Sequence, residues 1–202
     1  MPTSALPPFL AKHRHHWRAR AHLDKDFREI FIAEIISMSG GLLAGSILAA
    51  YINQILLIPG LLILLPGFLE MRGNISGSLS SRIGTALDMK QIPTQIKGNK
   101  VVWPNMLASF VETIVVALSL AAVAYVVTYI LFGTATLEIF PLALIAAVLA
   151  NTIEATLTLY TTFWLFKKGL DPNNVMGPYV TTTGDIISVV SLLIGIAVIA
   201  WV

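Results

Sequence analysis

Four acidic residues lie within runs of apolar sequence that are long enough to cross a lipid bilayer: Glu34, Glu112, Glu154 and Asp185. A carboxylate inside a membrane span is costly and usually has a function. We expect no lysine or arginine well inside these runs to neutralise the acids. The partner of these carboxylates is therefore expected to be a mobile cation or a proton.

The residue types in the chain favour a hard cation. The chain contains no cysteine, and its four histidines all lie in residues 1–28. Oxygen ligands alone suit Mg²⁺, Ca²⁺ or Mn²⁺ better than Zn²⁺ or Cu²⁺. Because Mg²⁺ loses its water reluctantly, one or two carboxylates with a few amides, hydroxyls and carbonyls are enough to hold it.

Asp185 is the first candidate ligand, because it lies well inside the last apolar run. Its alternative role is a structural hydrogen bond to a serine or threonine of another helix. A structural role is equally open for Glu112 and Glu154. The candidate metal ligands are Asp185, Asn74, Thr181, Thr182, Glu112 and Glu154.

Residues 56–88 combine an apolar run with two Pro-Gly pairs, at 59–60 and 66–67. Each proline removes a backbone N–H and frees a carbonyl from the helical hydrogen bonds. Inside a bilayer such a carbonyl must be buried in protein or line a wet cavity. Interrupted segments of this kind point to ion or substrate sites in transporters. The alternative is a kinked helix that ends in a polar loop.

The composition is that of an integral membrane protein. Of the 202 residues, 56% are hydrophobic and only 12% are charged, whereas soluble domains carry about 25% charged residues. We predict an all-α membrane protein with five transmembrane helices, of which Pro/Gly pairs interrupt the second and fifth. A basic tail, residues 1–28, precedes the membrane module, residues 29–202. The expected spans are 31–52, 55–69, 104–132, 140–166 and 179–201.

The positions of the basic residues predict the orientation in the membrane. All 13 lysines and arginines lie in segments 1–28, 70–103 and 167–178, and the intervening turns 51–54 and 133–139 contain none. Basic residues are enriched in cytoplasmic segments. We therefore expect a multi-pass protein of the cell membrane with the N-terminus in the cytoplasm and the C-terminus outside.

Two segments resemble the signatures of the SLC41/MgtE family of divalent-cation transporters. The first is PGFLEMRGNISGSLSSRIGTAL, residues 66–87, whose form is closer to the SLC41 branch than to bacterial MgtE. The second combines Gly169, Asp171-Pro172, Gly177-Pro178, a threonine pair and Asp185. The two signatures occur in the expected order, and the resemblance covers essentially the whole chain after residue 28.

This resemblance implies a two-fold dimer of five-helix subunits. The ion path runs at the dimer interface between the second and fifth helices, where the aspartate matching Asp185 faces the ion. The chain holds one such module and is expected to form a homodimer in the lipid bilayer. With this resemblance, the residues expected to line the path are Pro66, Gly67, Glu70, Gly73, Gly177 and Pro178.

The function that we predict is transport of divalent cations, most of all Mg²⁺, without a cofactor and without a nucleic-acid partner. Whether the protein is a channel or a Na⁺- or H⁺-coupled exchanger stays open. One alternative is a membrane-embedded, Mg²⁺-dependent enzyme that acts on lipid headgroups, but the clustered acids of such an enzyme are missing. Another is a non-transporting subunit that docks a soluble partner through the 70–103 segment.

Overall fold

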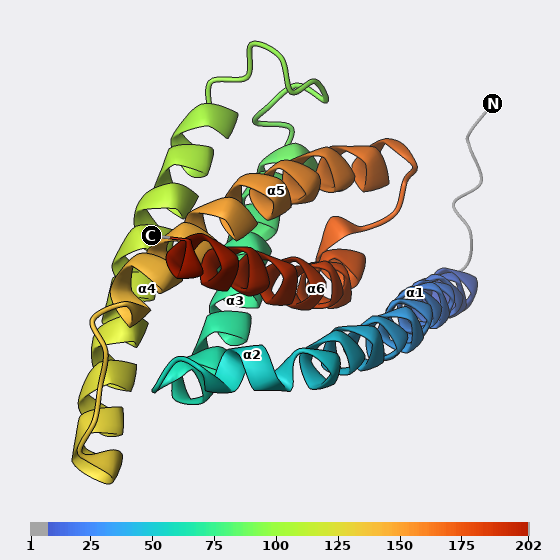
Figure 1. Cartoon of the computed structure of the whole chain (residues 1–202). Helices are drawn as coiled ribbons and strands as arrows, with labels where there is room; N and C mark the ends of the chain where they lie inside the picture. Colours follow the sequence, from blue (N-terminus) through green and yellow to red (C-terminus); the bar gives the residue numbers. More distant parts are fainter. Residues whose placement is uncertain (1–7, 202) are drawn as a thin grey trace, which may run out of the picture.

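The computed structural model describes the backbone of residues 8–201 and the side chains of residues 26–201. This part of the chain folds into six helices and contains no strand, as the predicted all-α class requires (Figure 1). The helices are α1 (Pro8–Ala50), α2 (Ile52–Leu56), α3 (Leu61–Asp88), α4 (Val102–Phe132), α5 (Ile139–Lys167) and α6 (Pro172–Ala200).

Four helices are long and apolar enough to cross a membrane: Asp26–Ala50 within α1, and α4, α5 and α6 over their full lengths. They match the first, third, fourth and fifth spans that the sequence predicts. The expected boundary between tail and membrane module, at residue 28, falls inside the continuous helix α1. The histidines, and the basic residues before residue 26, lie outside the described side chains.

Helix α3 differs from the predicted second span, which ends at residue 69 and is followed by a mostly polar segment with helical content at residues 76–87. Instead α3 runs without interruption through all of its 28 residues. At 1.5 Å per residue such a helix is about 42 Å long, which is enough to cross a bilayer. Its many glycines, serines and charged residues exclude it from the four apolar spans. It is helical because α4, α5 and α6 pack against it, and packing of this kind supplies most helical stability in proteins.

Of the expected Pro/Gly interruptions, only the one at Pro59 and Gly60 separates two helices. Gly60 has a φ of 88°, in the left-handed region that suits glycine, and it divides α2 from α3. Pro66 and Pro178 lie inside α3 and α6, which continue through them. The expected breaks at 66–67 and 177–178 are therefore wrong. Each proline removes one intrahelical hydrogen bond, and the packed neighbours hold the remaining turns in place.

Helix α3 forms the centre of the packing. It contacts α4, α5 and α6, whereas α1 packs against α6 and its first turns project away from the other helices (Figure 1). The largest apolar core joins leucines and Phe68 of α3 to alanines of α4 and α5. Small residues of this kind let membrane helices approach closely. Large apolar side chains on the outer faces of α1 and α4, including Leu42 and Ile130, are exposed as lipid contact requires.

An aspartate followed by proline is a sequence pattern of a helix start, with the acid as N-cap and the proline as first helical residue, and α6 begins in this way, seven residues before the expected span 179–201. Asp171 is the N-cap and Pro172 is the first helical residue. Oδ1 of Asp171 accepts hydrogen bonds from the backbone N–H of Asn173 at 2.9 Å and from the Asn173 side chain at 3.1 Å. The cap satisfies a backbone donor that the first turn of the helix cannot satisfy itself.

We predict that Asp171→Ala lowers the free energy of unfolding by about 1 kcal/mol, because the cap acceptor is lost. Asp171→Asn retains an oxygen acceptor and should stay close to the parent. Reversible unfolding in mixed detergent micelles measures both variants. An alanine variant as stable as the parent would contradict the role of this cap.

Candidate cation site

A cavity of about 390 Å³ lies between α3 and α6. Its polar lining brings together carboxylates, an amide and a hydroxyl, and none of its lining residues is basic. These residues are Pro66, Leu69, Glu70, Gly73, Asn74, Gly77, Gly177, Val180, Thr181 and Asp185. An arrangement of oxygen ligands without a basic residue can bind a cation.

Helix α3 supplies one wall of this cavity. Glu70, Gly73, Asn74 and Gly77 follow one another at helical spacing and therefore share one face. The opposite face of α3 is buried against other helices. A Cβ added at Gly73 would lie 3.7 Å from Thr181 Oγ1. The glycine thus leaves space in the cavity without being required to avoid a clash.

Helix α6 supplies the facing wall. Gly177, Thr181 and Asp185 are four residues apart and share one face of the helix. The Thr181 hydroxyl donates a hydrogen bond to the Gly177 carbonyl at 3.1 Å, which leaves its oxygen lone pairs available to a ligand. Asp185 is half-buried, and Glu70 of the opposite wall is near enough to act on it electrostatically. Two acids therefore face the same space.

The structure brings together three of the six candidate ligands and four of the six expected path residues. In the cavity lie Asp185, Asn74, Thr181, Pro66, Glu70, Gly73 and Gly177. Gly67 instead faces α4, where a Cβ would lie 2.7 Å from Leu120 Cδ2. Pro178 lines a small, mainly apolar cavity between α1 and α6. These two residues contribute to helix packing and lie outside the α3–α6 cavity.

Thr182 lies on the side of α6 that faces α1. Its hydroxyl donates to the Pro178 carbonyl at 2.9 Å, and its methyl group packs directly against Gly40 of α1. A side chain at Gly40 would overlap Thr182. Thr182 therefore holds α1 close to α6, while its neighbour Thr181 faces the cavity.

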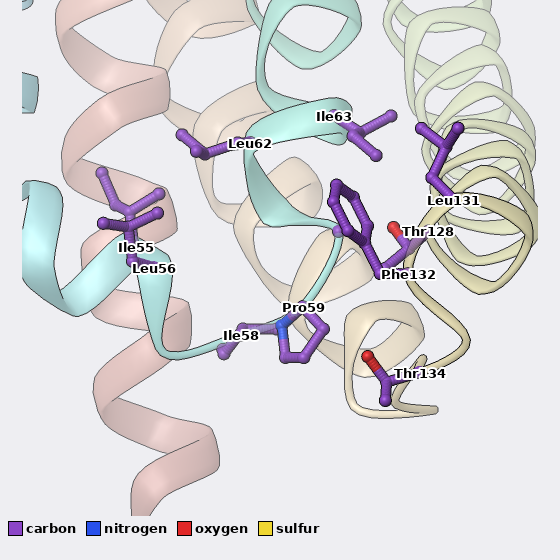
Figure 2. A pocket seen from close by; sticks show the side chains of 11 residues that line it. Ile55, Leu56, Ile58, Pro59, Leu62, Ile63, Thr128, Leu131, Phe132 and Thr134 are labelled. Atoms are coloured by element: carbon purple, nitrogen blue, oxygen red, sulfur yellow. The ribbon is translucent and has the colours of Figure 1, made fainter.

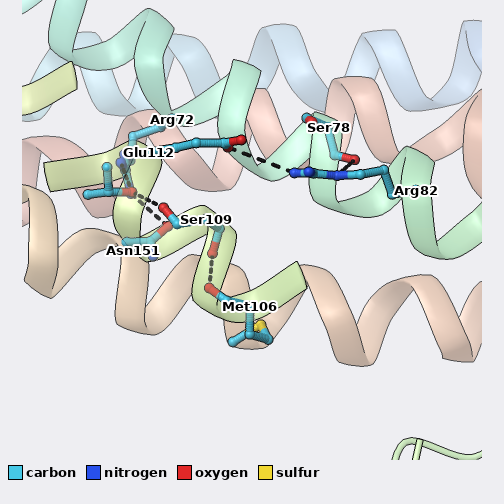
Figure 3. Close-up of polar contacts among 8 residues, drawn as sticks. Arg72, Ser78, Arg82, Met106, Ser109, Glu112 and Asn151 are labelled. Atoms are coloured by element: carbon cyan, nitrogen blue, oxygen red, sulfur yellow. Dashed lines mark hydrogen bonds and ion pairs between the residues drawn. The ribbon is translucent and has the colours of Figure 1, made fainter. Parts of the chain in front are cut away.

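Glu112 lies on α4, outside the cavity. Its carboxylate forms an ion pair with Arg82 of α3 at 3.8 Å, and both side chains are about 40% exposed. Arg82 also donates to the Ser78 carbonyl at 3.3 Å (Figure 3). The expectation that Glu112 has no basic partner is therefore wrong, because α3 continues as a helix alongside α4 and carries Arg82 to it.

Glu154 is completely buried on α5. Arg72 and Ser76 of α3 are near enough to influence its carboxylate electrostatically. Arg72 itself is completely buried. Its guanidinium donates to Asn151 Oδ1 at 3.2 Å and to Thr113 Oγ1 at 3.0 Å (Figure 3). No basic residue is expected well inside a span, and Arg72 lies on α3, which is not one of the four apolar spans, yet it is buried against α4 and α5. Arg72 lies four residues after Phe68 and seven before Leu79, so helical spacing places it on the same buried face. This spacing could have indicated that Arg72 is buried.

A second cavity, of about 470 Å³, lies where α2 turns into α3 (Figure 2). Its lining is apolar apart from two threonines, and it contains no charged residue. The hydroxyl of one of them, Thr128, already donates to the Ala124 carbonyl at 2.6 Å. This cavity lacks the ligands that a divalent cation requires.

The α3–α6 cavity is not a closed metal cage. Within the described residues, no group of three or more His, Cys, Asp or Glu side chains is placed to hold one ion. Two acids with an amide, a hydroxyl and nearby carbonyls instead suit an ion that keeps part of its hydration shell. Binding of this kind leaves the ion free to move on.

Comparisons with known proteins agree with this chemistry. The model of the MgtE family, described as divalent cation transporter, matches residues 65–195 and includes every residue of the α3–α6 cavity. Solute carrier family 41 member 2 of Xenopus laevis, Homo sapiens and Gallus gallus is 24% identical over 144 residues in each case. These matches cover 69% of this chain and 24% of each relative, so the chain spans about a quarter of their length. The chain belongs to the MgtE family of divalent cation transporters.

Proposed function

We propose that this protein transports divalent cations, most of all Mg²⁺, across the cell membrane through the α3–α6 cavity. The observation that carries the proposal is the meeting of Glu70 and Asp185 in a cavity lined by no basic residue. Asn74 and Thr181 add neutral oxygen ligands. The family membership of the chain supports the same activity.

Mg²⁺ fits the ligand types because it binds oxygen and retains several of its waters. Asp185 and Glu70 supply the charge that offsets partial dehydration. Mn²⁺ and Ca²⁺ have related ligand preferences. A competition series with these ions determines the selectivity.

We further propose that two copies of the chain complete the path. Glu70, Asn74 and Thr181 are exposed in the single chain, on the open side of the cavity. Facing lipid, these polar groups would cost several kcal/mol. A second copy related by a two-fold axis would cover them and bring another Asp185 to the same space. A divalent cation there relieves the repulsion between the acids.

In the proposed topology α3 crosses the membrane between α1 and α4, as the second of five crossings, so the termini lie on opposite sides of the membrane. Residues 89–101, between α3 and α4, contain three lysines, and Lys167 and Lys168 lie at the end of α5, before α6. Residues 133–138, between α4 and α5, contain no lysine or arginine. Arg72 and Arg82 drop out of the count of loop charges because both lie within α3. The remaining asymmetry still favours a cytoplasmic N-terminus.

Asp185→Asn tests the cation site, because it keeps the size of the side chain and removes its charge. We expect the dimer to stay intact and Mg²⁺ flux into proteoliposomes to fall by at least about tenfold, a loss of roughly 1.4 kcal/mol of interaction. Asp185→Glu should retain part of the flux. Glu112→Gln is the matched control, because it removes a carboxylate outside the cavity.

Normal Mg²⁺ flux by the Asp185→Asn variant would contradict this site. No flux by the parent protein, with correct insertion established, would contradict transport itself. That result would favour a subunit that docks a partner without moving ions.

Gly73→Ala and Asn74→Ala test the α3 wall. The alanine methyl at position 73 fits without a clash but projects toward Thr181, and the change at 74 removes an amide oxygen. We expect flux per protein to fall in both variants while expression changes little. Gly41→Ala is the control, because no atom lies within 4 Å of its added Cβ. If both cavity variants transport like this control, the path lies elsewhere.

The absence of native cysteine makes the proposed dimer testable with single cysteines. Asn74→Cys places a thiol on the exposed side of the cavity, and a bifunctional thiol reagent should join two copies in the membrane. Leu42→Cys, on the exposed face of α1, is the control and should stay monomeric on a denaturing gel. Equal crosslinking at both positions, or none at residue 74, would contradict the proposed interface.

A further inference from the structure

The apolar cavity at the turn from α2 into α3 shares no lining residue with the cation cavity. One wall comes from α2, the turn and the first residues of α3, among them Ile63. The other wall comes from the end of α4, with Leu131 and Phe132, and from the loop after it (Figure 2). Its volume of about 470 Å³ is within the roughly 300–1,000 Å³ that small-molecule sites occupy. The cavity is therefore large enough to hold part of a ligand.

The lining of this cavity favours an apolar ligand. Among the described residues that line it, none is charged, and only Thr128 and Thr134 have polar side chains. The hydroxyl of Thr128 already donates to the Ala124 carbonyl at 2.6 Å. Residues 51–63 and 123–139 contain no lysine or arginine. The cavity thus offers no positive charge to a phosphate or carboxylate, and a hydrocarbon chain fits it best.

The turn beside the cavity has backbone polar groups that lack hydrogen bonds. Within the described part of the chain, four such groups have no partner: the N–H of Gly60 and the carbonyls of Leu56, Leu57 and Pro59. In hydrocarbon each unpaired backbone group is costly and requires a polar partner. A ligand that satisfies the turn as well as the cavity therefore has a polar part next to its hydrocarbon chain.

The surroundings of the cavity are those of the edge of a lipid bilayer. Tyr51, just before α2, and Tyr129, near the end of α4, are both exposed, and tyrosine is enriched where hydrocarbon meets the headgroups. All residues from Tyr129 to Phe132 are exposed. Because four residues complete a helical turn, this turn of α4 is exposed on every side. A protein partner would cover only one side, whereas lipid surrounds the turn and reaches the cavity beside it.

We propose that this cavity binds an acyl chain of a membrane phospholipid, and that the glycerol ester region of the same lipid lies at the α2–α3 turn. The chain fills the apolar space between Ile63 of α3 and Leu131 of α4. The Gly60 N–H donates to an ester carbonyl of the lipid. Because the lining carries no charge, binding does not depend on the charge of the headgroup. The lipid joins the start of α3 to the end of α4 and so stabilises the folded protein.

A photoreactive lipid tests this site. The full chain is reconstituted in phosphatidylcholine vesicles that contain phosphatidylcholine with a diazirine in one acyl chain, and mass spectrometry after irradiation locates the adducts. We expect more adducts on cavity peptides than on the exposed face of α4 around Leu107. Leu131→Trp and Ile63→Trp fill the cavity from its two walls, and each should lower labelling of the cavity about tenfold. Leu107→Trp is the matched control, because Leu107 is exposed on α4 outside the cavity.

The melting temperature in detergent gives a second measurement. Phosphatidylcholine added to the delipidated protein should raise the melting temperature of the parent and of Leu107→Trp, because a ligand that binds only the folded state stabilises it. The increase should be smaller in Leu131→Trp and Ile63→Trp. Anionic phosphatidylglycerol should give the same increase as phosphatidylcholine, since no charged residue lines the cavity in the described part of the chain.

Four results would overturn the inference. Equal labelling along all exposed faces of α1 and α4 would leave only general lipid contact. Labelling of the cavity that neither tryptophan variant reduces would place the chain elsewhere. Greater stabilisation by phosphatidylglycerol would make the headgroup charge decisive. Crosslinking of Leu131→Cys between two copies, as efficient as that of Asn74→Cys, would make a second copy the occupant. None of these measurements uses ion flux, so they are independent of the proposed transport.

Discussion

The need to keep a polar helix away from lipid governs this structure. Helix α3 carries Arg72 and Ser76 on one face, and Glu70 and Asn74 on another. In hydrocarbon neither face is tolerated unless protein or water covers it. Helices α4, α5 and α6 cover the first face. The second face lines the cavity, which a second copy of the chain closes in the proposed dimer.

The same constraint divides the acids of the bundle into two kinds. Glu112 has a surface arginine as its ion-pair partner, and Glu154 lies within the influence of Arg72. Glu70 and Asp185 share a cavity without a basic lining residue. Glu70 and Asp185 are therefore the acids that the proposed divalent cation would neutralise.

Apolar runs and local motifs made much of this predictable. They indicated the four apolar spans, the cap at Asp171, and Asn74, Thr181 and Asp185 as candidate ligands, which the cavity brings together. Thr181 and Thr182 belong to the same motif, but successive residues of a helix point about 100° apart. Thr181 therefore lines the cavity, whereas Thr182 does not. The helical content of residues 76–87 was recognisable, but the continuity of α3 through residues 70–75 could not be read from composition, because charged residues, glycine and asparagine also typify loops. Arg72 was missed since its partners lie on α4 and α5, far away in sequence.

The central claim is that the cation binds between α3 and α6. An experimental structure of the protein in a bilayer mimetic with Mn²⁺, located by its anomalous scattering, tests this claim most directly. The account predicts a peak in the cavity beside Asp185 and Glu70, at a distance that allows coordination directly or through water. A peak beside Glu154 or Glu112, with none in the α3–α6 cavity, would contradict it.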